Sequence, residues 1–162
     1  MKKSILALAI LGATSVAQAG TVTMGVSNAT QDLSADSFSY SADNTGLMVD
    51  WHSDSLFGMK HLQQGLGWNG ATKEGNVLSY YIRPHMEITS GLELFGKLGA
   101  STSGASSNVS GLDSGLKVSP TYGVGLSYNL PSKFAVVAQY DQLYVDDYWD
   151  MSAISLGVSY QY

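Results

Sequence analysis

The last nine residues, Ile154-Ser155-Leu156-Gly157-Val158-Ser159-Tyr160-Gln161-Tyr162, alternate in polarity without a break. Successive side chains of a strand point to opposite faces, so the apolar residues of this stretch share one face and Ser, Gly and Gln share the other. A soluble edge strand can show the same alternation, but here the apolar face runs to the last residue and ends on an aromatic ring. The stretch therefore predicts a strand with an apolar phase on one side and a polar interior on the other.

Seven earlier segments repeat this alternation. It is clear in 134–142, 121–129, 92–100 and 78–87, and weaker in 59–69, 46–53 and 20–28. In 46–53, the outward set Leu47, Val49 and Trp51 alternates with the inward set Met48, Asp50 and His52. We therefore expect eight strands, counting the C-terminal one.

The links between these segments alternate in length. Those at 53–58, 89–91 and 129–133 are tight, whereas those at 29–45, 70–76, 101–117 and 144–151 are longer and polar. Outer-membrane barrels combine short periplasmic turns with longer outside loops. The rhythm predicts an all-β fold, an eight-stranded antiparallel transmembrane β-barrel over residues 20–162, with both termini on the periplasmic side. A soluble periplasmic β-sandwich is the structural rival.

The first residues have the layout of a secretory signal peptide. Lys2 and Lys3 give a positive start, an apolar run follows at 5–11, and Ala17-Gln18-Ala19 matches the small-x-small pattern of a cleavage site. The apolar run is far shorter than the roughly 20 residues that a membrane-spanning helix needs. We expect residues 1–19 to be removed, so that the mature chain starts at Gly20.

The composition excludes several classes of protein. The chain has no cysteine, so it has no disulfide and no cysteine-based metal site. Without Lys2 and Lys3, 6 basic residues (8 − 2) face 13 acidic ones, a formal charge of −7. We therefore expect no nucleic-acid partner, because such proteins need a basic surface.

Aromatic residues fall into two groups on this topology. The group expected near the outer rim is Trp68, Tyr80, Tyr122, Tyr140 and Tyr144. The group expected near the periplasmic rim is Trp51, Phe57, Tyr128, Phe134, Tyr160 and Tyr162. Two aromatic girdles at the membrane interfaces are typical of outer-membrane barrels.

Four short stretches resemble the small OmpA-like outer-membrane β-barrel family. They are Ser79-Tyr80-Tyr81-Ile82-Arg83-Pro84, Leu94-Phe95-Gly96-Lys97-Leu98-Gly99, Tyr122-Gly123-Val124-Gly125-Leu126-Ser127-Tyr128 and Leu156-Gly157-Val158-Ser159-Tyr160-Gln161-Tyr162. The resemblance implies an eight-stranded barrel that the barrel assembly machinery inserts. It also implies an assembly signal in the last strand, carried by Leu156, Val158, Tyr160 and Tyr162. Many members end in Phe, whereas this chain ends in Tyr162.

Charged residues gather on the face that the alternation turns inward. They are Asp50, His52, Arg83, His85, Glu87, Glu93, Lys97 and Asp141, and we expect His61 and Gln63 to join them. A charge that faces lipid costs roughly 2–4 kcal/mol at mid-membrane, and eight strands enclose just enough space for side chains to fill. We expect a lumen charge network of paired Asp50, Arg83, His85, Glu87, Glu93, Lys97 and Asp141. A gated ion path or a catalytic site is the alternative.

No catalytic, cofactor or metal site is expected. Lipid A deacylases of similar size carry a His-x-Ser pair late in the chain, but the last histidine here is His85, and the adjacent His52-Ser53 makes a poor dyad. The three histidines lack metal-ligand spacing. Asp146-Asp147-Tyr148-Trp149-Asp150 lacks the regular spacing of a calcium loop.

These patterns predict a structural protein of the Gram-negative cell outer membrane that supports envelope integrity or surface contact, without catalysis. The expected partners are outer-membrane lipid, lipopolysaccharide and, during insertion, the barrel assembly machinery. A narrow channel for ions or small solutes is one alternative. A surface adhesin that acts through its loops is another, and the sequence names no surface ligand.

Overall fold

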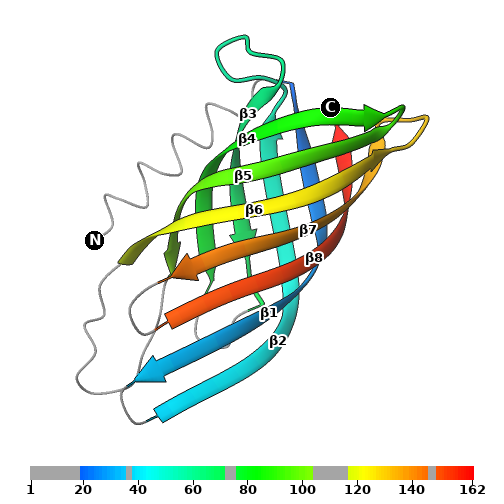
Figure 1. Cartoon of the computed structure of the whole chain (residues 1–162). Coiled ribbons are helices and arrows are strands. Elements are labelled where there is room, and N and C mark those ends of the chain that lie inside the picture. The colour runs from blue at the N-terminus through cyan, green and yellow to red at the C-terminus, as the bar shows by residue number, and fades with distance from the viewer. Residues whose placement is uncertain (1–18, 36–37, 72–75, 104–116, 146–148) are drawn as a thin grey trace.

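The computed structural model describes residues 19–35, 38–71, 76–103, 117–145 and 149–162. These residues form a closed antiparallel barrel in which consecutive strands pair and the last strand pairs with the first (Figure 1). The strands are β1 (Gly20–Ala35), β2 (Phe38–Ser53), β3 (Leu62–Asn69), β4 (Val77–Thr89), β5 (Leu92–Ser103), β6 (Lys117–Asn129), β7 (Phe134–Val145) and β8 (Trp149–Gln161). The predicted eight-stranded barrel is confirmed. Residues 1–18, which hold most of the expected signal peptide, lie outside the described residues.

The alternation of side chains is also confirmed in β8. Leu156 and Val158 are 56% and 52% exposed, whereas Ser155 and Ser159 are 2% and 3% exposed. Outward Val, Leu, Ile, Met and Tyr side chains on the other strands continue this surface into an apolar belt. Among the described residues, the structure has no helix with the length and apolar character needed to cross a membrane.

The first hairpin differs from the sequence prediction. Residues 29–45 were expected to form a long loop, but β1 and β2 stay paired from Gly20↔Ser53 up to Ala35↔Phe38. Figure 1 shows their tip projecting at the end of the barrel opposite to the C-terminus. The part of this hairpin nearest the tip carries polar residues, such as Thr30, Gln31 and Asp43, on both of its faces. The sequence there therefore shows no period-two apolar signal. Backbone pairing of β1 with β2 and β8 holds it extended instead.

Other links also shift. The link after β2 covers residues 54–61 rather than 53–58, because His61 and the residues before it form a turn instead of the start of β3. β5, β7 and β8 extend into the expected loops at 101–117 and 144–151. What remains of the three longer outer loops falls largely on residues 72–75, 104–116 and 146–148, outside the described part of the chain.

The two chain termini of the barrel meet at one end, which we call the terminus end. The backbone N–H of Tyr162 donates to the carbonyl oxygen of Gly20 (3.1 Å). Trp51, expected to face outward into lipid, is only 8% exposed. Its indole lies beside Gly20 and reaches the hydroxyl of Tyr162, the residue that follows β8.

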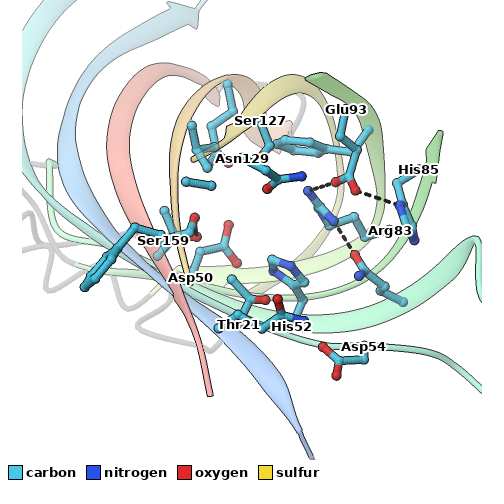
Figure 2. A pocket seen from close by; sticks show the side chains of 18 of the residues that line it. Thr21, Asp50, His52, Asp54, Arg83, His85, Glu93, Ser127, Asn129 and Ser159 are labelled. Carbon is cyan, nitrogen blue, oxygen red and sulfur yellow. Dashed lines mark hydrogen bonds and ion pairs between the residues drawn. The ribbon is translucent and has the colours of Figure 1, made fainter. Parts of the chain in front are cut away.

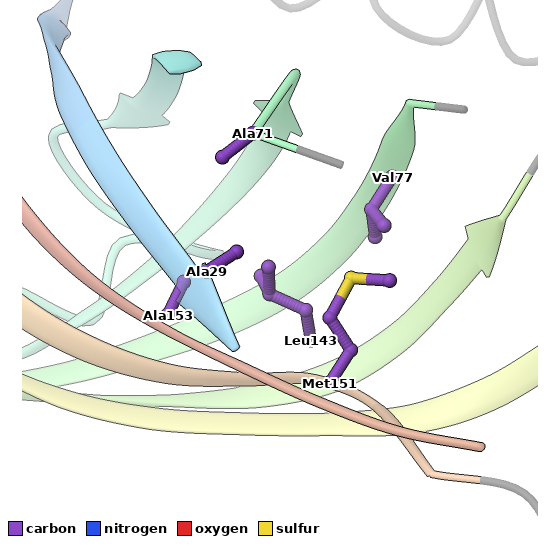
Figure 3. Close-up of a cluster of buried hydrophobic side chains, with 6 residues drawn as sticks. All are labelled: Ala29, Ala71, Val77, Leu143, Met151 and Ala153. Carbon is purple, nitrogen blue, oxygen red and sulfur yellow. The ribbon is translucent and has the colours of Figure 1, made fainter. Parts of the chain in front are cut away.

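The opposite end, called the hairpin end, holds a cluster of apolar side chains beside buried polar ones such as Asn69 and Ser101. A buried cluster there joins Ala29, Ala71, Val77, Leu143, Met151 and Ala153 (Figure 3). Its members come from β1, β4, β7, β8 and the residues after β3. The cluster gives this end of the interior an apolar core, although the sequence patterns predicted a polar interior throughout.

Candidate functional site

A layer of charged residues crosses the middle of the interior. The ammonium group of Lys97 on β5 pairs with the carboxylate of Asp50 on β2, and it lies 3.6 Å from an oxygen of Asp141 on β7. The hydroxyl of Tyr81 on β4 donates to the other oxygen of Asp50, and its ring lies 4.7 Å from the Lys97 ammonium. One cation therefore holds two carboxylates from opposite walls. Gln139 donates a further hydrogen bond to Asp141 (2.7 Å).

Inward glycines make room for the two large rings of the interior. A Cβ atom at Gly65 on β3 would overlap the ring of Tyr81, and one at Gly125 on β6 would overlap the ring of Phe95. Both rings are buried. Large side chains from other strands thus fill the space beside the small inward residues, and the packing near mid-height is dense.

A second charged group lies nearer the terminus end and centres on Arg83 of β4 (Figure 2). Its guanidinium donates to Gln63 on β3 and to a carboxylate oxygen of Glu93 on β5 at 2.7 Å. The guanidinium carbon also lies 3.9 Å from the centre of the Phe95 ring, in cation–π geometry. The other oxygen of Glu93 lies 2.9 Å from Nδ1 of His85.

His85 connects this group to the link between β2 and β3. Its Nε2 lies 2.9 Å from the carbonyl oxygen of Lys60, and its ring stands 5.9 Å from that of His61. Glu87 lies apart from both charged groups. It is exposed near the end of β4 and accepts a hydrogen bond from the backbone N–H of Gly91 in the turn to β5 (3.2 Å).

A cavity of about 500 Å³ occupies the terminus half of the interior. Its walls are mostly polar, and Figure 2 shows Thr21, His52, Arg83 and Glu93 around it. Towards the hairpin end, a separate void of about 20 Å³ lies between the charged layer and the apolar cluster. The smaller void has room for about one water molecule. The interior is thus a polar cavity, a charged layer and an apolar cluster in series.

The interior charges are paired between strands. The five charges of Asp50, Arg83, Glu93, Lys97 and Asp141 each contact an opposite charge, as buried ions require. Within the described ranges, no three His, Asp or Glu side chains are placed to hold a metal ion.

The structure brings together six of the seven expected network residues, in two groups, and leaves Glu87 at the rim. Gln63 joins the second group, whereas His61 is exposed. Two features escaped sequence reasoning. The role of Tyr81 as a hydrogen-bond donor to Asp50 had no signal beyond its inward position. The apolar cluster draws single residues from distant segments, so no local pattern announces it.

The four residues expected to carry the assembly signal lie along the outer face of β8 and, for Tyr162, directly after it. Leu156, Val158, Tyr160 and Tyr162 are all exposed, and the centre of the Tyr160 ring lies 5.2 Å from that of the Phe134 ring on β7, with the two rings tilted by 49°.

Comparison with known proteins agrees with this architecture. The attachment invasion locus protein Ail of Yersinia pestis, solved in complex with the heparin analogue sucrose octasulfate, superposes with a TM-score of 0.57 and 20% identity over 88% of this chain and 99% of that chain. Neisserial surface protein A superposes with a TM-score of 0.56 and 17% identity over 88% of this chain and 97% of that chain. The N-terminal β-barrel domain of Pseudomonas aeruginosa OprF superposes with a TM-score of 0.52 and 19% identity over 88% of this chain and 99% of that chain. At these identities the likeness establishes the fold alone.

No curated protein sequence matches the chain. Residues 4–162, however, match the sequence model of the outer membrane protein beta-barrel domain. Because this match spans nearly the whole chain, the protein belongs to the outer membrane protein beta-barrel domain family and is a β-barrel of the Gram-negative outer membrane.

Proposed function

We propose that this protein is a non-catalytic structural component of the outer membrane that supports envelope integrity. The observation that carries the proposal is the pairing of charges between opposite walls of a closed barrel, with Lys97 between Asp50 and Asp141. Breaking a buried pair by removing one partner costs about 3–5 kcal/mol. Such a network ties β2, β5 and β7 together through the interior and leaves no charged group in the layer for substrate.

The series of barriers inside the barrel argues against the channel alternative. A solute that entered the cavity from the terminus end, which is the periplasmic end in this family, would meet the charged layer first. Beyond it lie Leu143, Met151 and the rest of the apolar cluster. A path through both would need Lys97 to leave two carboxylates and the cluster to separate, so we expect the barrel to be closed.

The proposal includes lipid partners and an assembly partner. The apolar belt is suited to acyl chains of phospholipid and lipopolysaccharide. The outward face of β8, with Leu156, Val158, Tyr160 and Tyr162, is suited to recognition by the barrel assembly machinery before β8 pairs with β1. These four side chains remain outward in the closed barrel, so recognition does not compete with interior packing.

The test is a deletion strain complemented by two versions of the protein. We expect the deletion to increase uptake of a hydrophobic dye and sensitivity to bile salts, and wild type to restore both barriers. A Lys97→Met version should restore them less well, in proportion to its loss of folded protein on a heat-modifiability gel. A deletion strain whose barrier equals that of wild type would contradict the structural role.

A second function, surface contact, is favoured by the free edge of β2. β3 pairs with β2 only from Met48 to His52, and Gly70 and Ala71 cover Leu47 and Gly46, so the β2 backbone from Phe38 to Thr45 has no neighbouring strand on that side among the described residues. Exposed strand edges can accept an added strand from a partner. Asp32 and Asp43 make this hairpin acidic, so we propose a neutral or basic partner rather than a polyanion such as the ligand in the Ail complex.

Shortening the hairpin separates the two functions. Replacing residues 32–41 by a two-residue turn keeps every β1–β2 pair up to Gln31↔Ala42 and removes from the β1–β8 seam only the pairs Asp32↔Asp150 and Leu33↔Trp149. If the protein mediates surface contact, the shortened version should lose adhesion to host cells or matrix while it restores the envelope barrier. Unchanged adhesion would remove this second candidate and leave the structural role untouched.

A further inference from the structure

The cavity of about 500 Å³ in the terminus half of the barrel contrasts with the filled interior near mid-height. There, the rings of Tyr81 and Phe95 occupy the space beside inward glycines. Around the cavity, small inward residues such as Ser127, Ala135 and Ser159 leave space that the protein does not fill. Dense packing stabilises a protein interior, so a structural role alone gives no reason for this space. Departures from such packing concentrate at functional sites.

The cavity is a pocket that is closed at its inner end. Exposed residues of the turn between β6 and β7, including Ser132 and Lys133, line its outer part at the terminus end. Lys97 and Asp50 line its inner part, and their ion pair separates it from the hairpin end. A solute from the periplasm can therefore bind in this pocket without crossing the barrel.

His52 on β2 is a buried polar residue that faces this pocket. It is 7% exposed, and Figure 2 shows its ring directed into the cavity. Its side chain makes no hydrogen bond or ion pair within the described part of the chain. A neutral imidazole has one N–H donor and one nitrogen acceptor, and a buried donor or acceptor without a partner costs free energy. The partner of His52 must therefore come from the contents of the cavity.

The charges around the cavity do not select an ion. Three acidic and three basic residues line it, so their formal charges sum to zero: Asp50, Asp54, Glu93, Arg83, Lys97 and Lys133. The deep charges are already paired, Lys97 with Asp50 and Arg83 with Glu93. A charged ligand at that depth would have to break one of these pairs or stay unpaired itself, and both are costly. An uncharged ligand leaves both pairs intact.

The groups that remain for a ligand are uncharged and can both donate and accept hydrogen bonds. Besides His52, the side chains of Thr21, Ser127 and Gln161 line the cavity, and none of them has a hydrogen bond to another described residue. Hydroxyl and amide groups serve as donor and acceptor, as do the hydroxyl groups of a sugar or polyol. Val137 of β7 adds an apolar surface, against which the C–H groups of a sugar ring can pack.

We propose that this cavity binds a small, uncharged, hydroxyl-rich solute, a free sugar or polyol, from the periplasmic side. Its volume lies within the range of roughly 300–1,000 Å³ that is typical of small-molecule sites. His52 supplies the buried hydrogen-bonding group, and Thr21, Ser127 and Gln161 supply the others. The proposal goes beyond the structural role and does not rest on it, so a failed binding test leaves that role untouched.

The test is saturation-transfer difference NMR on the refolded protein, with maltose as the probe. The detergent is deuterated lauryldimethylamine oxide, because it has no sugar headgroup to compete. We expect magnetisation to pass from the protein to the maltose protons, with an effect that saturates in the millimolar range. Glycine betaine, a zwitterion, and sodium sulfate, which supplies an anion, should not displace maltose.

Two variants on β7 form a matched pair. Ala135→Phe fills the cavity from the inward face, so we expect the maltose signal to disappear. Ala138→Phe places the same ring on the exposed face of the same strand and should bind maltose as wild type does. His52→Leu removes both hydrogen-bonding groups of the imidazole, and we expect the affinity to fall about tenfold. Heat-modifiability gels verify that each variant is folded.

Four results would contradict the proposal. Wild type that transfers no magnetisation to maltose would show that the cavity holds water only, and an equal signal in folded Ala135→Phe would place binding elsewhere. Displacement of maltose by glycine betaine or sulfate would show that the site takes a charged ligand. If maltoheptaose binds as tightly as maltose, the cavity takes the end of a glycan chain, and the assignment to a free solute is wrong.

Discussion

The indole Nε1 of Trp51 donates a hydrogen bond to the hydroxyl oxygen of Tyr162 at 2.8 Å, across the side-chain-free position of Gly20. The bond links β2 to the end of β8 and spans β1, which lies between them. A Cβ atom at Gly20 would come within 3.1 Å of the indole nitrogen and 2.8 Å of the His52 carbonyl oxygen. The terminal Tyr162, where many resembling proteins have Phe, therefore has a specific partner.

This bond should contribute to the stability of the seam between β1 and β8. Tyr162→Phe keeps the ring and removes the acceptor, so we expect a loss of about 0.5–1.5 kcal/mol in the free energy of unfolding. In a Trp51→Phe background the same change should cost much less, because the donor is already gone. Urea unfolding of refolded protein measures both. Tyr160→Phe is the matched control, and equal losses in the two backgrounds would contradict the pairing.

Arg83 should be required for a stable interior. Arg83→Ala leaves Glu93 without its guanidinium, and we expect a cost of about 3–5 kcal/mol. Arg83→Met should cost no less, because the carboxylate is still stranded, whereas Arg83→Met with Glu93→Gln should recover part of the loss. Urea unfolding gives these values, with the exposed Lys133→Met as the control. If the Arg83 variants are as stable as wild type, the charge network does not stabilise the barrel.

Arginine substitutions along β8 should report which face meets lipid. Leu156→Arg and Val158→Arg place a charge among acyl chains, at a cost of about 2–4 kcal/mol at mid-membrane, and should reduce the folded fraction on a heat-modifiability gel. Ser159→Arg should be tolerated best, because Ser159 borders the cavity. Ser155→Arg should prevent folding by overpacking the interior, because the hydroxyl oxygen of Ser155 lies 3.0 Å from that of Ser27. If a lipid-soluble reagent labels cysteines introduced at positions 155 and 159, these positions face lipid and the register is wrong.

The purified, refolded barrel should conduct poorly or not at all in planar bilayers. Leu143→Ala with Met151→Ala thins the apolar cluster, yet we still expect closed behaviour, because Lys97 continues to bridge Asp50 and Asp141. Rare, small openings are compatible with this picture. Steady steps of a single size, abolished by a bulky residue at Gly125 beside Phe95, would favour the channel instead.

The mature protein should begin at Gly20. Ala17 and Ala19 motivate cleavage at this bond, and Gly20 is the first residue of β1. N-terminal sequencing of protein from the envelope fraction checks it. An envelope form that starts at Met1 would refute the prediction.

The strand count and the facing of side chains were predictable because they depend on local period-two patterns. Phe134 to Asp141 illustrates this, since each residue in that stretch has the facing that its position implies. The length of β1 and β2 was not predictable. Beyond the apolar belt, both faces of these two strands carry polar residues such as Thr30 and Asp43. Only pairing with neighbouring strands keeps the backbone extended there.

Sequence by itself determined that this chain is an eight-stranded barrel, and that Asp50, Arg83, Glu93, Lys97 and Asp141 face its interior. Which of these residues pair was decided only by the closed barrel, because strand tilt and register set which distant side chains share a level. Lys97 meets Asp50 and Asp141 from strands that are not its neighbours, whereas Glu87, which faces inward by the same pattern, lies too near the rim to join them. The apolar cluster and the bond from Trp51 to Tyr162 likewise arise from closure, which brings together residues more than a hundred positions apart in the chain.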